Sequence, residues 1–152
     1  MAQDGSWLYH GSPIERKELV KLFASVLRRE ADGSYWLVTP AERGRIEVDD
    51  VPFVAVELAA EGTGMRRKLR LRTNLDQWLT LGPDHRLELR RRPGHAVDPG
   101  PVPYVQVRAG LEARLARPVY YELVELGEEW REHGRMRFGV WSEGWFFALD
   151  EP

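Results

Sequence analysis

The sequence predicts an α+β fold made mostly of antiparallel strands. Three observations support this class. Short segments of strand-like composition recur along the chain between turns rich in Gly, Asp and Ser. Two other segments have the apolar spacing of an amphipathic helix. Finally, one strand-like segment is nearly repeated, because VPFVAV at residues 51–56 recurs as VPYVQV at residues 102–107.

Composition places the chain among ordinary globular proteins and limits its partners. Its 152 residues are 43% apolar and 30% charged, which is enough apolar material for a core. The formal net charge of −2 gives no overall attraction to duplex DNA or to an anionic membrane. The N-terminus does not have the pattern of a signal peptide, no apolar run approaches the ~20 residues that span a bilayer, and cysteine is absent. We therefore expect a cytoplasmic protein without a membrane span.

The first helix is predicted to start at Pro13, after a short strand at residues 7–9. Ser12 and Glu15 have the spacing of a capping box, in which each side chain would bond the backbone N–H of the other residue. Pro13 suits the first helical position because that position needs no N–H donor. Apolar residues then follow the helical period along one stripe. The stripe consists of Leu19, Val20, Phe23, Val26 and Leu27.

Turn residues separate the remaining predicted elements. Strands are expected at residues 35–39, 45–48, 53–58, 68–72, 78–81, 86–90, 104–107, 113–116, 137–141 and 145–149. The pair 78–81 and 86–90 should form a hairpin, as should the last two strands around Ser142-Glu143-Gly144. A loop rich in Pro and Gly spans residues 93–101. A second helix should start at Pro118 and place Tyr121 near Val124 in the core, which leaves Tyr120 facing outward.

The repeated segment suggests an internal duplication. The offset that relates the two segments also lays residues 35–38 over residues 86–89. A six-residue match can also arise by chance, since strands draw on few residue types. If the duplication is real, the chain forms two related small domains, residues 1–74 and 75–152, with superposable strand arrangements at 35–58 and 86–107.

Stretches distributed over nearly the whole chain carry a family resemblance. They are WLYHGSPIERKELVKLFASVLRR, YWLVTPAERGRIEV, DVPFVAVEL, RTN, RPVYYELVE and VWSEGWFF. In these stretches the chain resembles the bacterial domain-of-unknown-function family 1285. The resemblance implies a duplicated α+β core whose second domain is pleckstrin-homology-like with a closing helix. It also implies a site for a nucleotide-like ligand near the domain interface and an association with signal transduction, but no activity.

No pattern of catalytic or metal-binding residues stands out. The four histidines lack ligand spacing, and no phosphate-binding loop of the Walker type is present. Ser12 follows His10 closely, but it has no nucleophile elbow around it. We therefore expect a non-enzymatic protein without a metal or cofactor, although an enzyme of unknown reaction remains an alternative.

Local charge points to a phosphate site. Residues 65–92 contain nine Lys or Arg and three Asp or Glu. Arg72 and Arg117 each end a strand that follows a copy of the repeat, and their planar guanidinium groups suit phosphate. Thr73 and Asn74 add neutral donors. The alternative is a solvated strand face near an acidic helix.

Two further residues complete the predicted ligand site. Tyr120 could stack on a base. Arg16 lies just inside the predicted first helix and could reach the domain interface, although Glu15 would compete with any anion at that helix N-terminus. The leading hypothesis is a cleft between two domains that binds a phosphate-bearing, nucleotide-like ligand and couples it to a signalling partner. The rival hypothesis is a protein interaction module without a small ligand.

Overall fold

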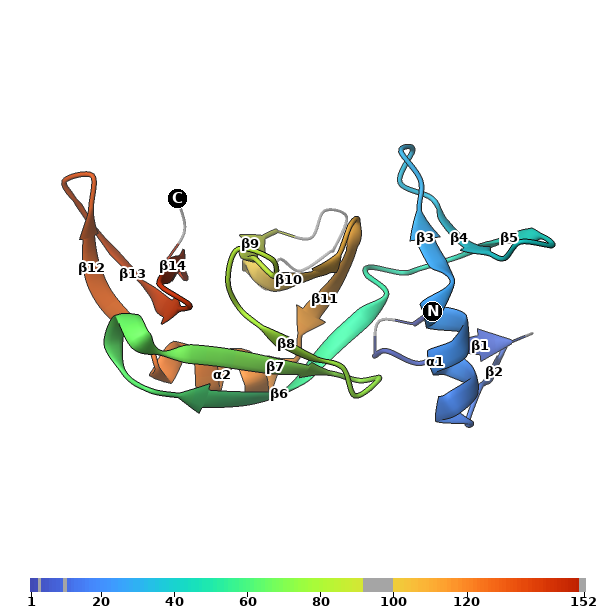
Figure 1. Ribbon diagram of the computed structural model, residues 1–152, viewed down its shortest axis with the longest axis horizontal. Coiled ribbons are helices and arrows are strands. Elements are labelled where there is room, and N and C mark those ends of the chain that lie inside the picture. Colours follow the sequence, from blue (N-terminus) through green and yellow to red (C-terminus); the bar gives the residue numbers. More distant parts are fainter. Residues whose placement is uncertain (3, 10, 92–99, 151–152) are drawn as a thin grey trace.

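The protein has an α+β fold, described by a computed structural model for residues 1–2, 4–9, 11–91 and 100–150 (Figure 1). Its helices are α1 (Lys17–Ser25), α2 (Arg117–Glu125) and a 3-10 turn, η1 (Gly64–Arg66). Its strands are β1 (Leu8–Tyr9), β2 (Ser12–Pro13), β3 (Leu27–Arg29), β4 (Tyr35–Val38), β5 (Arg43–Ile46), β6 (Phe53–Glu61), β7 (Lys68–Thr73), β8 (Trp78–Thr80), β9 (Leu87–Arg90), β10 (Val102–Arg108), β11 (Leu111–Leu115), β12 (Glu128–Glu132), β13 (Arg135–Ser142) and β14 (Trp145–Ala148). In the described part of the chain, no helix is long and apolar enough to cross a membrane.

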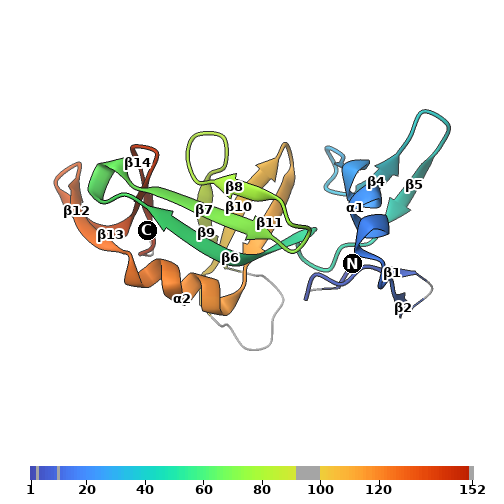
Figure 2. The same ribbon diagram turned by 60° about the horizontal axis from the view of Figure 1, so that its bottom comes forward.

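A six-stranded sheet forms the middle of the molecule, in the order β8-β7-β6-β11-β10-β9. Its strand pairs are antiparallel except β11 with β6, which run parallel with Ala113 opposite Phe53. Buried and less buried residues alternate along β7 and β11, as expected for strands with one face on the core. The helix α2 lies along β6 and buries Val119 and Leu123 against the core (Figure 2).

Two smaller sheets flank the six-stranded one (Figure 1). At one end, β12, β13 and β14 form a three-stranded sheet. It is joined to the main sheet by Ser142, whose buried hydroxyl accepts a hydrogen bond from the N–H of Leu69 (2.9 Å) and donates one to the carbonyl of Leu81 (2.6 Å). At the other end, β3, β4 and β5 form the second three-stranded sheet, beside α1.

The N-terminal elements are fixed to the main sheet by polar side chains. Arg108 of β10 donates to the carbonyl oxygens of Ala24 (2.7 Å) and Leu27 (3.3 Å), just where α1 ends. A cation at this place satisfies free carbonyl groups and the negative end of the helix dipole. Lys17 and Lys21 of α1 reach Asp76 after β7, at 3.0 and 3.1 Å. The helix is therefore held at both ends by residues of the main sheet.

The predicted capping box is wrong, because residues 12–13 are a strand. Ser12 lies opposite Tyr9 and Pro13 opposite Leu8. The N–H of Ile14 donates to the carbonyl of Trp7 (2.7 Å), which extends this pairing. The helix begins only at Lys17 and has no side-chain cap. It also ends earlier than the apolar stripe suggests, because Leu27 belongs to β3.

The predicted hairpin of residues 78–81 and 86–90 is also wrong. The strands β8 and β9 lie at opposite edges of the main sheet, β8 paired with β7 and β9 with β10. The final hairpin of β13 and β14 is confirmed, with Ser142 opposite Trp145. The structure adds β12, which the sequence analysis did not predict. Of the predicted loop at 93–101, residues 93–99 lie outside the described residues, and only 100–101 are described.

The two halves of the repeat lie in one sheet, as β6 and β10 on either side of β11. Their neighbours differ, because β9 pairs with β10, whereas β4 pairs with β3 and β5 instead of β6. The prediction that residues 35–58 and 86–107 share one strand arrangement is therefore wrong. The main sheet also crosses the predicted domain boundary after residue 74, since β7 and β8 are paired.

Candidate functional site

The predicted site residues at the end of β7 are engaged in local contacts. The guanidinium of Arg72 bonds to the carboxylates of Glu57 (3.1 Å) and Asp76 (3.0 Å). The hydroxyl of Thr73, which is almost fully buried, accepts hydrogen bonds from the backbone N–H groups of Leu75 and Gln77. These contacts close the turn from β7 to β8. A phosphate at Arg72 would have to compete with two carboxylates.

Asn74 joins the N-terminal segment to β6. Its side-chain oxygen accepts from the N–H of Val54 (3.1 Å), and its side-chain nitrogen donates to the carbonyl of Gly5 (3.2 Å). On the other side of β6, the N–H of Ala116 donates to the carbonyl of Ala55 (2.9 Å). Asn74, after β7, and Ala116, after β11, therefore bond to two adjacent residues of β6, Val54 and Ala55.

Arg117 is the first residue of α2 and is exposed, and Arg16 is exposed at the N-cap of α1. Tyr120 is partly buried against the core, and burial raises its pKa. Tyr121 is instead 58% exposed, so the expectation that Tyr120 faces outward and Tyr121 inward is wrong. Successive helical residues are ~100° apart, which puts residue 121 roughly opposite the buried stripe of Val119.

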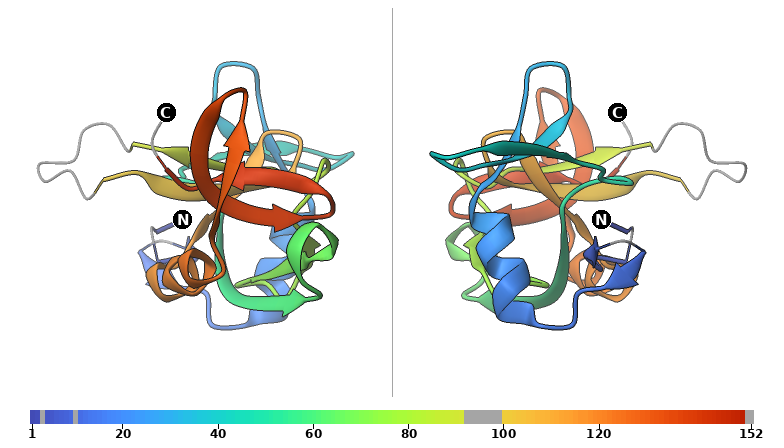
Figure 3. Two further views of the ribbon diagram at one scale, coloured as in Figure 1. Left: turned by 90° about the vertical axis from the view of Figure 1, so that its left-hand side faces the viewer. Right: turned by 90° about the vertical axis from the view of Figure 1, so that its right-hand side faces the viewer.

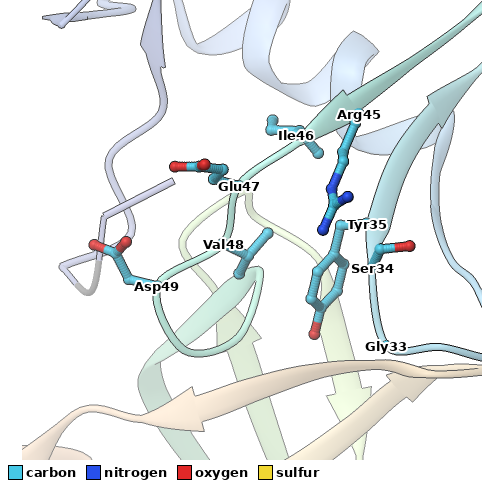
Figure 4. Close-up of a pocket in the computed structure, with 8 residues that line it drawn as sticks. All are labelled: Gly33, Ser34, Tyr35, Arg45, Ile46, Glu47, Val48 and Asp49. Atoms are coloured by element: carbon cyan, nitrogen blue, oxygen red, sulfur yellow. The ribbon is translucent and has the colours of Figure 1, made fainter.

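A hollow with a volume of about 400 Å³ lies elsewhere, beside residues 47–52, the linker between β5 and β6 (Figure 4). We call it the linker pocket. It is lined by Gly33, Ser34, Tyr35, Arg45, Ile46, Glu47, Val48 and Asp49. One wall is the start of β4, and the other is the end of β5 with the first linker residues.

Figure 4 shows these residues, with the carboxylates of Glu47 and Asp49 pointing away from Tyr35 and Arg45. Tyr35 is 8% exposed, and burial is the main reason that its pKa is raised. Arg45 is exposed and makes no ion pair within the residues that the structure describes. The pocket therefore offers one cation, a partly accessible tyrosine and two carboxylates.

Hydrogen bonds order the residues next to Arg45. The hydroxyl of Ser34 donates to Asp32 (2.5 Å) and accepts from the indole N–H of Trp36 (2.8 Å). The pKa of Asp32 is lowered, chiefly by the hydrogen bonds from Ser34 and to a smaller extent by the charge of Arg45. These hydrogen bonds hold the side chain of Ser34, which lines the pocket.

The linker is fixed to the main sheet by a second polar group. The hydroxyl of Tyr104 on β10 bonds to both carboxylate oxygens of Asp50, at 3.0 and 3.2 Å. The guanidinium of Arg90 lies 4.1 Å from the centre of the Tyr104 ring and forms two hydrogen bonds with Glu112, at 2.8 and 3.0 Å. These contacts fix the path of the linker beside the pocket.

Comparison with known proteins divides the chain at this same linker. The family model described as "Domain of unknown function (DUF1285), N-terminal domain" matches residues 1–51. The model described as "Protein of unknown function (DUF1285), C-terminal domain" matches residues 52–149. The chain belongs to the DUF1285 family. All residues that line the linker pocket belong to the N-terminal domain, and the last of them, Asp49, comes just before the boundary between the two domains.

Two solved structures are similar to this DUF1285 chain. A DUF1285 family protein from Silicibacter pomeroyi DSS-3 is 42% identical, with a TM-score of 0.84 over 97% of this chain and 76% of that one. A DUF1285 family protein from Shewanella baltica OS155 is 26% identical, with a TM-score of 0.58 over 80% of this chain and 85% of that one. No curated protein matches the chain.

The linker pocket was not predicted from the sequence. Arg45 and Tyr35 fall in predicted strands, and the excess of cations that suggested a phosphate site lies in residues 65–92 instead. The pair of Arg72 and Asp76 could have been recognised, since oppositely charged residues four apart often meet. The pocket itself has no local signal, because its walls come from two strands and the linker.

Proposed function

We propose that the chain is a non-catalytic binding protein whose linker pocket holds a small phosphate-bearing, nucleotide-like ligand. The observation that carries the proposal is the position of Arg45, an exposed guanidinium without an ion-pair partner among the described residues, on the wall of a hollow in the N-terminal domain. Its volume of about 400 Å³ is in the range of small-molecule sites.

The chemistry of the pocket limits the ligand. Arg45 suits a phosphate, since its planar guanidinium donates two parallel hydrogen bonds. Glu47 and Asp49 also line the hollow, and their negative charge would repel additional negative charge on the ligand. A ligand with one phosphate therefore fits better than a polyphosphate.

The test is calorimetric titration of the full chain with a panel of nucleoside monophosphates. Arg45→Ala should lower affinity by tenfold to hundredfold, because a hydrogen bond to a charged group is worth ~1.5 to 3 kcal/mol. Arg45→Lys should recover part of the binding, since it keeps the charge but loses the forked geometry. Arg131→Ala, at an exposed position on β12, is the matched control. Equal affinity of parent and Arg45→Ala would refute the proposed pocket.

The residues expected from the sequence define an alternative place for the same ligand. These residues lie around the start of β6 and the start of α2, and they are Arg72, Thr73, Asn74, Arg117 and Tyr120. Arg117→Ala is the informative variant, because Arg117 is exposed and makes no ion pair within the described residues. Loss of nucleotide binding in this variant, with Arg45→Ala unaffected, would move the ligand to the flanks of β6. Arg16, on α1, belongs to neither group.

An interaction module is the second candidate function, and exposed aromatic residues favour it. Trp130 is 36% exposed, Trp145 43% and Tyr121 58%. The expected signalling role would fit such a surface. A pleckstrin-homology-like C-terminal domain and an origin of the two domains by duplication remain part of this proposal, although the strand arrangements of the repeated segments differ. A pull-down in which Trp130→Ala abolishes capture of one partner, with the linker pocket intact, would favour this function over ligand binding.

A further inference from the structure

One face of the small N-terminal sheet carries a row of side chains in register across all three strands. Arg28 of β3 lies opposite Trp36 of β4, and Trp36 lies opposite Arg45 of β5. Residues opposite one another in an antiparallel pair share a face, so these three side chains lie on the same side. Arg43, two residues before Arg45, lies on that side as well. We call these four residues the Arg-Trp face.

The Arg-Trp face points to solvent, because the other side of the sheet faces the protein. Leu27 and Tyr35, which belong to that other side, are 2% and 8% exposed. In contrast, Arg28, Arg43 and Arg45 are exposed and Trp36 is partly buried. The right-hand view of Figure 3 looks at the end of the molecule formed by α1 and this sheet.

Trp36 and Arg43 form an ordered stack on this face. The guanidinium carbon of Arg43 lies 4.4 Å from the centre of the Trp36 ring. Glu30 bonds to Arg43 at 3.1 Å, and the indole N–H is bonded to Ser34. The side chain of Arg43 is still 54% exposed. A planar guanidinium supported from beneath and open above is a surface on which a nucleobase can stack.

Arg28 and Arg45 flank this stack. Neither makes an ion pair within the described ranges of the chain, and each lies one strand spacing, about 5 Å, from Trp36. The nearby Asp32 forms hydrogen bonds with Ser34 and interacts with Arg45 only through its charge. Two available guanidinium groups on either side of a stacking surface suit a strand whose bases stack in the middle and whose phosphates run past the edges.

We propose that the Arg-Trp face binds single-stranded nucleic acid. Proteins that bind single strands combine aromatic stacking with cations that follow the backbone, often on an open sheet. A duplex hides its bases and would be held by charge alone, which this chain with a net charge of −2 does not favour. The proposal goes beyond the ligand of the linker pocket and shares with it only Arg45, which borders both sites.

Fluorescence anisotropy of the full chain with labelled single strands tests the proposal. Unstructured DNA and RNA of roughly 12 nucleotides, within the site sizes of single-strand binders, are compared with a duplex of equal length. The parent should bind the single strands more tightly than the duplex. Trp36→Ala removes the ring that supports the Arg43 guanidinium, on which a base would stack, so it should weaken binding by roughly fivefold to hundredfold, as loss of one stacked base does. Arg28→Ala should reduce the slope of log affinity against log salt by ~0.7.

Matched controls separate this face from general surface effects. Trp145, with Arg86 over its ring at 5.3 Å, is a comparable stack on the opposite small sheet. Trp145→Ala and Arg131→Ala should change affinity less than about twofold, within the usual range for residues away from a site. Trp36→Leu keeps apolar volume without a flat ring and replaces Trp36→Ala if circular dichroism shows that the alanine variant does not fold.

Each outcome of these measurements either supports or overturns single-strand binding at the Arg-Trp face. Three results would overturn the proposal: no binding of single strands by the parent, equal binding of the duplex, or an equal loss of affinity in Trp145→Ala. If the parent binds no single strand, a protein partner is left as the occupant of the Arg-Trp face. Arg28→Ala should leave nucleoside monophosphate binding unchanged. Failure of the single-strand proposal is therefore distinguishable from failure of the proposed linker-pocket function.

Discussion

Ser142 provides the sharpest test of how the small C-terminal sheet is held. Its side chain is fully buried, and its hydroxyl bridges the N–H of Leu69 and the carbonyl of Leu81. The N–H of Leu81 already bonds to the carbonyl of Leu69, so the hydroxyl continues the ladder between these two segments beyond its last backbone hydrogen bond. Ser142→Ala removes both side-chain bonds and leaves one buried donor and one buried acceptor unsatisfied.

The cost follows from these two groups. An unsatisfied buried polar group costs about 1–3 kcal/mol, so the variant should lose about 3 kcal/mol of unfolding free energy. With an m-value of roughly 2 kcal/mol/M for urea, the unfolding midpoint should fall by about 1.5 M. Ser25→Ala is the matched control, since its hydroxyl also donates to a backbone carbonyl, that of Leu22 at 2.6 Å, but is exposed to water. A Ser142→Ala midpoint equal to that of Ser25→Ala would refute the reasoning.

Three further predictions concern stability. Gly139→Ala should lower the free energy of unfolding by at least ~1–3 kcal/mol, because a Cβ there would collide with the backbone carbonyl of Phe147. Gly44→Ala is the control and should change thermal stability little, because no atom lies within 4 Å of a Cβ placed at Gly44. The pKa of Asp76 is lowered to about 2, chiefly by hydrogen bonds from two lysines, so the stability that its ion pairs contribute is present above about pH 4 and is lost as the pH falls toward 2. Asp76→Asn should remove that part of the pH dependence when the melting temperature is measured over a series of acidic pH values. An unchanged pH profile would contradict the pairing. Ser12→Ala should leave the urea midpoint unchanged within error, and a clear loss would restore the capping role that the structure denies.

Local signals were sufficient where an element is defined by its own residues. Pro118 near the start of α2 and the apolar spacing of Val119 and Leu123 mark that helix, and the turn at 142–144 marks the last hairpin. The capping box failed because Ser12 and Pro13 pair with Tyr9 and Leu8 in a short hairpin, which keeps these residues extended instead of helical.

The remaining errors concern pairing between distant segments. The segment EEWRE of β12 has one apolar residue, so it shows no burial pattern, and its strand conformation depends on β13. The turn after β8 predicted a hairpin of β8 with β9, but β8 pairs with β7 and β9 pairs with β10. The same limit applies to the linker pocket. Alternation predicts that Tyr35 and Arg45 lie on strands, but only the path of residues 47–52 brings them to a common hollow.

The parallel pairing of β11 with β6 has a consequence for synthesis of the chain. The pairs β3 with β4, β4 with β5, and β6 with β7 join neighbours and can form as soon as they leave the ribosome. The apolar start of β6, around Phe53–Ala55, has to wait for residues 113–115. Until then it presents an open strand edge that another nascent chain can pair with. A messenger truncated before β11 would therefore yield a product whose N-terminal hairpins are formed but whose exposed edge promotes aggregation.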